Sequence, residues 1–491
     1  MIIPPLFRTS EIRAIEQAHG TAGLMEKAGL AVATLAKELL SDEAYSILII
    51  AGPGNNGGDA LVAARYLKSW WLRVDVFFTG DPERMPPDAT AAYRAWLDAG
   101  GELLSALPEK TYDLVIDGLF GIGLAKVLHG HYSELVRQIN AMEAPVLAID
   151  VPSGLCANTG RVLGEAVIAD HTLTFLGLKP GLFTLDGVDC AGTVHSSDLG
   201  VDTGAVAHPQ GWLLNEIPIL PSPRLRNSHK GNNGSIGVLG GDTAMVGAAL
   251  LTARAALLIG AGRVYAGLLT EKTPAVDPVQ PELMLRDGNS LLDLKHLTAL
   301  VAGPGLGRSA LAEGALHRAL RYPAHLVLDA DALVLLAANA ELRQTLAARE
   351  HPTLLTPHPG EAAALLAGSV ADVQADRIAS ALDLAVKYRA TVLLKGAGTV
   401  IAMPDGQWFI NASGNPGLAT AGMGDTLAGI IGGLAAQGME LDQAAMLGTY
   451  LHGAAADTLV AEGIGPLGLT ASEVALAARK LINLWITQEY E

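Results

Sequence analysis

The chain has 491 residues, of which half are apolar, and a formal net charge of −17 at pH 7. This length exceeds what one ordinary hydrophobic core organises, so we expect at least two domains. The negative charge disfavours binding to nucleic acids or to anionic membrane surfaces, although a nucleotide site built from backbone N–H groups remains compatible with it.

Two further features exclude other classes of protein. The two cysteines, Cys156 and Cys190, form no zinc-like pattern with the histidines, so we expect a reduced, cytoplasmic setting. The longest apolar stretch, Ala244–Gly262, is interrupted by Arg254 and is rich in alanine and glycine. We interpret it as a buried helix and not as a membrane span.

The first half of the chain alternates apolar runs with helical patterns, which indicates an α/β fold with a Rossmann-like, doubly wound sheet. In such sheets ligands bind beyond the carboxyl ends of the strands. The predicted helices span residues 57–70, 88–99 and 131–142, and the predicted strands are Ser46–Ala51, Val74–Phe78, Asp113–Asp117 and Val146–Asp150.

Strand Ser46–Ala51 runs into Gly52–Ala60, a turn rich in glycine and asparagine, and then into a helix. This is the layout of a dinucleotide phosphate site. The spacing differs from the G-x-G-x-x-G pattern with a later acid, which disfavours an ordinary dehydrogenase. Asn55 and Asn56 could hold a cation or a ribose, or could simply cap a tight turn.

Three oxygen-bearing side chains follow the next strands. Asp117, Asp150 and Ser153 are expected at adjacent strand ends, close to the asparagine-rich turn. Oxygen atoms from neighbouring loops suit potassium or another hard cation. The structural alternative is that the two aspartates only cap loops.

This half resembles the NAD(P)H-hydrate epimerase family in Leu24–Gly29, Gly52–Ala60, Asp117–Gly123 and Ile149–Gly154. That family interconverts the two epimers of hydrated NADH or NADPH. The resemblance implies a general acid or base at Asp150 and potassium ligands at Asn56, Asp117 and Ser153. It places the hydrated cofactor on Asp150 and on two loops, namely Asn55, Asn56, Gly57, Gly58 and Asp59, with Gly121, Ile122, Gly123, Leu124, Ala125, Lys126 and Val127. Lys126 keeps the charge of the arginine expected near it but not the planar fork.

The segment Trp212–Ser228 contains three prolines and no clear periodicity, so it is the candidate linker. We expect a first domain at residues 1–214, a linker at 215–228 and a second domain at 229–491. A second α/β pattern begins with strand Ser235–Gly240 and a helix over 244–261. Its further predicted strands are Ala299–Ala302, Leu326–Asp329, Thr353–Thr356 and Thr391–Leu394.

The segment Asn411–Gly433 places a glycine-rich turn before a helix, with Asp425 where the helix begins. Free N–H groups and the positive end of the helix dipole favour a phosphate there. Asp425 could then serve as the base for an attacking hydroxyl group in phosphoryl transfer. It could equally be a helix N-cap, and this segment alone supports the two interpretations equally.

Three other loops follow predicted strands of the second half. They are Gly303–Gly307, Thr356–Glu361 and Lys395–Thr399. Taken alone, the last of these is best interpreted as an ordinary hairpin turn, and the second is as compatible with a structural turn as with a substrate contact. Their convergence with the Asp425 loop on one face of the sheet favours a nucleotide site.

In these loops residues 225–491 resemble the ADP/ATP-dependent NAD(P)H-hydrate dehydratase family, which has a ribokinase-like α/β fold. That family phosphorylates the ring hydroxyl of the hydrated cofactor and then eliminates phosphate. The resemblance implies that Asp425 takes the hydroxyl proton and that magnesium accompanies the nucleotide phosphates. ADP or ATP is expected on Lys395, Gly396, Ala397, Gly398, Thr399, Gly422 and Gly424, and the hydrated cofactor on Ala248, Gly305, His358 and Asp425.

We therefore expect a bifunctional enzyme, an isomerase and a lyase, that repairs hydrated NADH and NADPH with ADP or ATP as co-substrate. Its expected partners are these small molecules, in a homo-oligomer that binds neither nucleic acid nor membrane. The alternative is a ribokinase-like kinase of a small molecule, such as a vitamin precursor, with a non-catalytic, nucleotide-sensing N-terminal domain.

Overall fold

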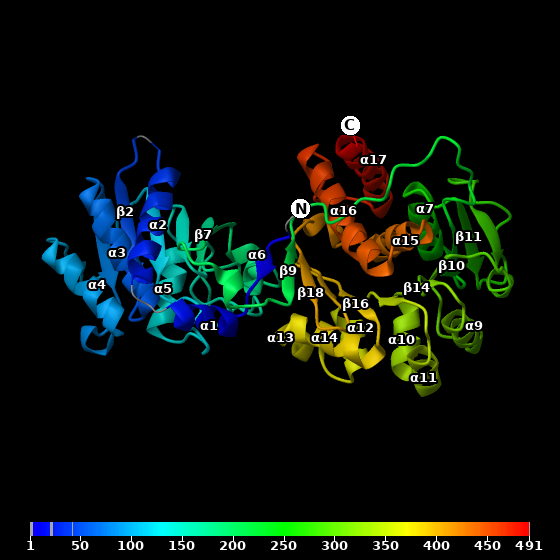
Figure 1. The fold of residues 1–491 in the computed structure, drawn as a ribbon, viewed down its shortest axis with the longest axis horizontal. Coiled ribbons are helices and arrows are strands. Elements are labelled where there is room, and N and C mark those ends of the chain that lie inside the picture. Colours follow the sequence, from blue (N-terminus) through cyan, green and yellow to red (C-terminus); the bar gives the residue numbers. More distant parts are fainter. Residues whose placement is uncertain (1–2, 20–22, 42, 491) are drawn as a thin grey trace. The chain divides into compact units, whose positions relative to one another are not determined.

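The computed structural model describes residues 3–19, 23–41 and 43–490. They form two compact units, the first made of residues 4–211 and the second of residues 212–490 together with Ile3, and each unit is described by itself (Figure 1). Residues 215–228, the predicted linker, contain neither helix nor strand. The chain thus changes unit slightly before the predicted end of the first domain at residue 214, and the predicted boundaries stay a proposal.

The first unit is built on a parallel sheet with the strand order β4-β3-β2-β5-β6-β7-β8. Its helices are α1 (Thr9–His19), α2 (Leu24–Leu39), α3 (Asn55–Ser69), α4 (Pro87–Asp98), α5 (His131–Asn140) and α6 (Gly187–Cys190). Its strands are β1 (Pro5–Leu6), β2 (Ser46–Ala51), β3 (Arg73–Phe78), β4 (Leu103–Leu104), β5 (Leu114–Gly118), β6 (Val146–Ile149), β7 (His171–Phe175) and β8 (Thr193–Ser197).

Both faces of this sheet are covered, which explains why β2 is apolar throughout. Ile47 and Ile49 pack with residues of α1 to α4, whereas Leu48 and Ile50 pack with residues of α5. The chain proceeds from β2 to β3 and β4 in one direction and from β5 to β8 in the other. The loops after β2 and β5 therefore diverge and leave a crevice at the carboxyl edge, where ligands of such sheets bind.

The second unit has the strand order β9-β18-β17-β16-β15-β14-β13-β10-β11-β12. Its strands are β9 (Gly211–Leu214), β10 (Ser235–Gly240), β11 (Arg263–Leu268), β12 (Met284–Asp287), β13 (Ala299–Ala302), β14 (His325–Leu328), β15 (Thr353–Leu355), β16 (Thr391–Leu394), β17 (Val400–Ala402) and β18 (Trp408–Asn411). Strands β10 to β16 pair in parallel, whereas β17 pairs antiparallel with both β16 and β18.

Helices cover both faces of this second sheet. Figure 1 shows α7, α15, α16 and α17 gathered on one face, with α10, α12 and α14 on the other. The helices are α7 (Val246–Leu258), α8 (Gly288–Leu291), α9 (Ala310–Leu320), α10 (Asp331–Ala338), α11 (Ala340–Ala347), α12 (Pro359–Leu366), α13 (Val370–Ala375), α14 (Arg377–Tyr388), α15 (Met423–Ala436), α16 (Leu441–Ala461) and α17 (Ala471–Tyr490). The strand order changes direction again, between β10 and β13, which opens a second crevice.

Two predicted strands end one residue early because a carboxylate leaves the strand. Asp150 has φ 65, which no strand residue adopts, and β6 ends at Ile149. In the second unit β14 ends at Leu328, and the side chain of Asp329 turns to other partners described below. The predicted helix over 244–261 also starts late, at Val246, because Ala244 has φ 66.

Helix α15 lies close to helix α7, and glycine permits the approach. A Cβ atom at Gly429 would lie 2.9 Å from the Cβ atom of Ala255, and closer still to the carbonyl oxygen of Thr252. Because that oxygen belongs to the backbone, it cannot move aside like the end of a flexible side chain. Close packing of α7 against α15 thus fixes the position of the turn that precedes α15.

We predict that Gly429→Ala lowers the free energy of unfolding of the second unit by about 1–3 kcal/mol, because the added methyl overpacks the contact between α7 and α15. Gly314→Ala is the matched control, since Gly314 is an exposed position of helix α9 where a methyl group would meet no atom within 4 Å. It should leave stability unchanged or raise it by up to about 1 kcal/mol. Urea unfolding measures the free energy of unfolding of both variants. Equal losses in the two variants would contradict the predicted overpacking at Gly429.

Candidate active sites

The centre of the second unit's site is an ion pair at the ends of two strands. The Nζ atom of Lys395, after β16, lies 2.7 Å from Oδ1 of Asp329, after β14. Thr356, after β15, donates its hydroxyl to the same oxygen at 2.9 Å, and Asp329 is only 1% exposed. Burial lowers the pKa of Lys395, but the charges of Asp329 and Glu361 outweigh it and raise that pKa above its usual value. The lysine is therefore a fixed positive charge.

Asp425 lies in the first turn of α15 and is not its N-cap. The cap position is Gly422, with φ 87 and no side-chain hydrogen bond to the helix. The N-cap interpretation of Asp425 is therefore wrong, because glycine provides the left-handed turn that starts the helix. Burial raises the pKa of Asp425 to about 6, Asp329 adds to this, and Lys395 opposes it.

Gly424 brings the start of α15 against the lysine. A Cβ atom at Gly424 would lie 3.3 Å from Nζ of Lys395. The ammonium group, the carboxylate of Asp425 and the free N–H groups of the first helical turn are thus gathered in one place. This arrangement suits an incoming phosphate and a hydroxyl group that must lose its proton.

The segment Lys395–Thr399 forms the turn between β16 and β17, which pair antiparallel. Its interpretation as a hairpin turn is correct as to shape, and the nucleotide role predicted for Gly396, Ala397, Gly398 and Thr399 stays a prediction. Arg377 stabilises the start of the turn, because its buried guanidinium donates to the carbonyl oxygens of Leu394 and Lys395 at 3.2 and 3.3 Å. A Cβ atom at Gly396 would lie 2.8 Å from Arg377 Nη1.

A cavity of about 370 Å³ opens at the crevice between β10 and β13. It contains all three residues predicted for the hydrated cofactor outside the Asp425 loop, namely Ala248, Gly305 and His358. Gly305 permits this shape, since a Cβ atom there would lie 2.5 Å from the carbonyl oxygen of Met245. The complete lining is Ala244, Met245, Gly247, Ala248, Gly305, Arg308, Ala330, Asp331, Val334, His358 and Glu361.

His358 and Glu361 form a reciprocal cap at the start of α12. The Nδ1 atom of His358 accepts hydrogen bonds from the N–H groups of Gly360 and Glu361 at 2.9 and 3.3 Å. The Oε2 atom of Glu361 accepts from the N–H of His358 at 2.8 Å. Burial lowers the pKa of His358, aided by Lys395. His358, which lies between two prolines in the sequence, is thus the cap residue of α12. His358 and Glu361 also line the cavity.

In the first unit Asp117 and Ser153 contact each other, as their predicted positions at adjacent strand ends required. The hydroxyl of Ser153 donates to Oδ1 of Asp117 at 2.7 Å, and its N–H donates to Oδ2 at 2.8 Å. Asp117 is fully buried, and burial raises its pKa to about 6 despite these hydrogen bonds. Asp117 therefore fixes the loop after β6 against the loop after β5.

Asp150 is paired with a lysine that sequence reasoning left without a role. The Nζ atom of Lys179 lies 2.6 Å from Oδ1 of Asp150, and the lysine side chain is 1% exposed. The same ammonium also donates to Thr174 Oγ1 at 2.8 Å and to the carbonyl oxygen of Phe175 at 2.6 Å. These three bonds use all three N–H groups of the lysine. The lysine does not bind the second carboxylate oxygen of Asp150, Oδ2.

Gly121 marks the point where the predicted ligand loops meet. A Cβ atom there would lie 3.0 Å from Oδ1 of Asn56 and 3.1 Å from Oδ2 of Asp150. The N–H of Ile122 faces the same carboxylate oxygen at 3.3 Å. Further along this loop Gly123, Ala125, Lys126 and Val127 are exposed, and Leu124 is half-buried.

Two more carboxylates belong to this region. Asp59, predicted as a ligand, has a pKa raised well above its ordinary value by burial and by the charges of Asp150 and Glu16. Burial and Asp150 also raise the pKa of Glu16, on α1, a residue that sequence reasoning missed. Helix α1 lies far from the glycine-rich turn in sequence, so only the fold reveals this proximity. Asn55, Gly57 and Gly58 occupy the first turn of α3 beside Asn56.

The residues predicted to hold potassium fit a hard cation chemically. Asp117, Ser153 and Asn56 all carry side-chain oxygen atoms, which are the ligands that a hard cation takes. The buried amide nitrogen of Asn56, Nδ2, has no hydrogen-bond partner, but it is a donor and does not itself bind a cation. Across the part of the chain that the structure describes, no group of three or more His, Cys, Asp and Glu side chains is arranged to hold a metal.

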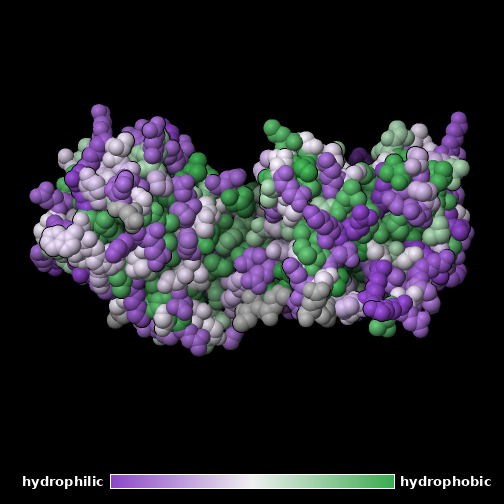
Figure 2. All heavy atoms as spheres, turned by 90° about the horizontal axis from the view of Figure 1, so that it is seen from above, coloured by the Kyte–Doolittle hydropathy of each residue, from purple (hydrophilic) through white to green (hydrophobic). Residues whose placement is uncertain are grey.

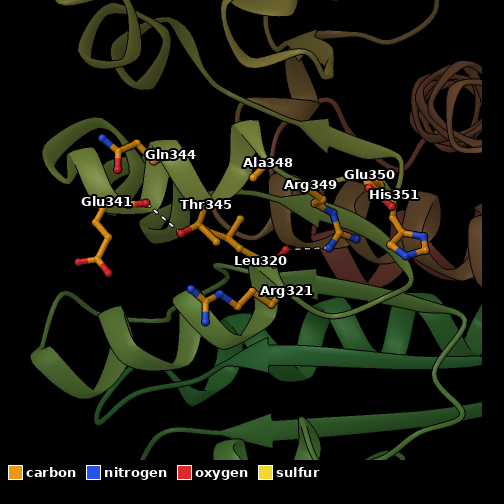
Figure 3. A pocket seen from close by; sticks show the side chains of 9 residues that line it. All are labelled: Leu320, Arg321, Glu341, Gln344, Thr345, Ala348, Arg349, Glu350 and His351. Carbon is orange, nitrogen blue, oxygen red and sulfur yellow. Dashed lines mark hydrogen bonds between the residues drawn. The ribbon is translucent and has the colours of Figure 1, made fainter.

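A larger cavity, of about 540 Å³, lies between α9 and α11, and no predicted site residue lines it (Figure 3). Its most buried cation, Arg349, donates to the carbonyl oxygens of Leu320 and Tyr322 at 2.9 and 2.6 Å, and also to that of Ala324. The guanidinium is thus occupied in holding the end of α9. We interpret this cavity as a structural groove.

Hydrophilic side chains are spread over the visible face of the chain (Figure 2). Among the described residues, no helix combines the length and the apolar character needed to cross a bilayer. The apolar stretch that contains α7 is a buried helix, as predicted, with Ala249, Ala253 and Ala256 fully buried.

Comparison with known proteins relates each unit to a family. Residues 236–476 match the family model described as NAD(P)H-hydrate dehydratase, and residues 21–181 match the model described as YjeF-related protein N-terminus. Among solved structures, an ADP/ATP-dependent NAD(P)H-hydrate dehydratase from Bacillus subtilis, co-crystallised with ATP and Mg²⁺, is 30% identical. It covers 55% of this chain and 95% of its own, with a TM-score of 0.48.

Relatives of full length carry both units. The bifunctional NAD(P)H-hydrate repair enzyme of Escherichia coli is 38% identical over 95% of this chain and 90% of its own length. The enzyme of the same name from Vibrio cholerae is 40% identical over 96% of this chain and 94% of its own. With the order of the two sites and this coverage together, the chain belongs to the family of bifunctional NAD(P)H-hydrate repair enzymes.

Proposed function

We propose that this chain repairs hydrated NADH and NADPH in two steps. The first unit interconverts the R and S epimers, and the second dehydrates the S epimer with ADP or ATP through a transient phosphate ester. The observation that carries the proposal is the arrangement of Lys395, Asp329 and Asp425 at the start of α15, where a phosphate and a base for a hydroxyl group are both provided for. Cytoplasmic location and a homo-oligomeric state stay predictions.

In the second unit the turn Lys395–Thr399 and Gly424 hold the nucleotide. The N–H groups at the start of α15 and the ammonium of Lys395 stabilise the charge that develops on the transferring phosphoryl group. Asp425 accepts the proton of the ring hydroxyl as that oxygen attacks. Magnesium bound to the nucleotide supplies additional positive charge at the phosphates. Ala248, Gly305 and His358 surround the hydrated ring.

In the first unit Asp150 is the general acid or base. Lys179 holds Oδ1, so the opposite oxygen, Oδ2, exchanges protons with the ring hydroxyl of the substrate. The loops Asn55–Asp59 and Gly121–Val127 orient the hydrated cofactor. Asn56, Asp117 and Ser153 would hold potassium, which would supply a positive charge beside the two ligand loops.

Product analysis separates this proposal from a small-molecule kinase. With purified S epimer of hydrated NADH, we expect ADP or ATP to restore the absorbance of NADH and to release one free phosphate for each molecule restored. ADP is the expected preferred donor. A kinase would instead leave a stable phosphorylated product with no recovery of absorbance, and that result would reject the dehydratase.

The ionisation of Asp425 predicts the pH dependence of phosphoryl transfer. Its pKa is raised to about 6, so the base becomes protonated, and the single-turnover rate of AMP formation from ADP falls, as the pH is lowered through about 6. Asp425→Asn should reduce that rate by roughly 10²–10⁴-fold and remove this inflection. Epimerisation by the same variant is the internal control and should persist. A variant that keeps most of its rate would show that Asp425 is not the base.

For the first unit we predict that Asp150→Asn combined with Lys179→Met reduces epimerisation by at least about 10²-fold. Both charges are removed because a lysine left buried without its partner costs about 3–5 kcal/mol of stability. Exchange between the epimers, followed by chromatography, measures the rate, and dehydration of the S epimer serves as the control for folding. If epimerisation continues unchanged, Asp150 is neither the acid nor the base.

A further inference from the structure

The dehydration needs two proton transfers, and Asp425 accounts for one. In the first transfer the ring hydroxyl loses its proton as it attacks the nucleotide phosphate. In the second, the neighbouring ring carbon loses a proton, the electron pair of that C–H bond forms the ring double bond, and phosphate leaves with the electrons of the C–O bond. Asp425 carries the hydroxyl proton after the first transfer, so a second base allows the elimination to follow without Asp425 first losing that proton.

The cavity of about 370 Å³ at the crevice between β10 and β13 is lined by a carboxylate that has no role in the proposed phosphoryl transfer. Glu361 lines the cavity together with Ala248, Gly305 and His358, and it is 7% exposed. It lies in the first turn of α12, whose cap fixes its side chain. A buried carboxylate that is held rigidly against the substrate cavity has the position that a base for a ring proton needs.

His358 does not fit the role of that base. Its Nδ1 atom accepts two backbone hydrogen bonds, so the neutral ring carries its proton on Nε2, which lies 3.3 Å from Oε1 of Glu361. The ring therefore presents an N–H to the glutamate and has no free lone pair. Its Nε2–H orients Oε1 of Glu361.

The other acidic groups nearby are engaged elsewhere. Asp329 accepts the ammonium of Lys395 and the hydroxyl of Thr356. Asp331, which also lines the cavity, accepts the N–H of Gly307 at 3.0 Å and pairs with Arg308 at 3.4 Å. Glu361 is the cavity carboxylate with no lysine or arginine within ion-pair distance among the described residues.

We propose that Glu361 is the base of the elimination step, which takes the proton from the ring carbon next to the phosphorylated one. This inference rests on the proposed dehydratase function and adds a second catalytic residue to it. Asp425 and Glu361 then divide the reaction, the first acting on an oxygen proton and the second on a carbon proton.

The electrostatics of the site suit this division. Burial raises the pKa of Glu361 to about 7, with Asp329 and Asp331 adding to the effect and Lys395 and the N–H of His358 opposing it. A base whose pKa lies near the working pH combines a useful ionised fraction with strong basicity. Deprotonation of a carbon atom needs that basicity more than deprotonation of a hydroxyl during phosphoryl transfer does.

Glu361→Gln tests the proposal, because glutamine keeps the size of the side chain and can still serve in a helix capping box. In single turnovers with ADP and the S epimer, AMP formation should keep the wild-type rate. NADH formation should slow by at least about 10-fold, and a phosphorylated intermediate should accumulate in ³¹P spectra. Glu341→Gln, an exposed first-turn glutamate of α11, is the matched control and should behave as wild type.

The wild-type enzyme provides a second measurement that does not depend on the folding of a variant. Substrate deuterated at the neighbouring ring carbon should slow NADH formation and leave AMP formation unchanged, and NADH formation should fall as the pH is lowered through about 7. If Glu361→Gln slows both products equally, or neither, Glu361 is not this base. If the wild-type enzyme itself makes no NADH, the proposed dehydratase function is wrong. That outcome is distinct from the failure of Glu361 as the base, in which the wild type does make NADH.

Discussion

Lysine–aspartate pairs, one buried and one partly buried, are the interactions on which both sites depend. Removing an ammonium and a carboxylate from water is costly unless each is paired and hydrogen-bonded, and both pairs meet that condition. Lys179 is held by Asp150, Thr174 and a carbonyl oxygen. Lys395 is held by Asp329, which also accepts from Thr356. Each pair therefore places a fixed charge at the carboxyl edge of a sheet, beside the group that exchanges protons.

The strand order of each sheet changes direction at one point. Between β2 and β5, and between β10 and β13, the following loops run to opposite sides and leave room for a ligand. Glycines make this space usable. Gly121 in the first unit and Gly305 in the second approach their neighbours so closely that a side chain would collide with ligand-facing groups or with the backbone. The same layout thus supports two different reactions.

Local patterns predicted the elements well, because the strands concerned are buried on both faces and read as short apolar runs. β2, β10, β13 and β16 have the predicted bounds, and the predicted helices of the first unit appear as α3, α4 and α5. The antiparallel strands β17 and β18, and β11 and β12, were not predicted. The pairing of such strands is set by contacts distant in sequence.

The loops of the two sites were predicted from their motifs, whereas the ion pairs within the sites were not. Asp425, Lys395 and His358 stood out because each follows a turn with a distinct composition. The partners Asp329 and Lys179 were given no role, although Lys179-Pro180-Gly181 matches the epimerase family and Asp329 ends a predicted strand. Ionic partners that lie 66 or 29 positions apart become visible only when the strands are assembled. The cap formed by His358 and Glu361 was local, yet its second role depends on the cavity that it faces.

The central claim is that one chain carries both steps, so that epimerisation supplies the dehydratase with the form it consumes. The most direct measurement is the progress curve of NADH absorbance when a mixture of both epimers is incubated with the full-length chain and excess ADP. The account predicts complete recovery for the wild type. With Asp150→Asn and Lys179→Met combined, it predicts a fast phase limited to the S fraction and then only slow spontaneous recovery. Identical complete curves for the two proteins would contradict it, and so would no recovery in either.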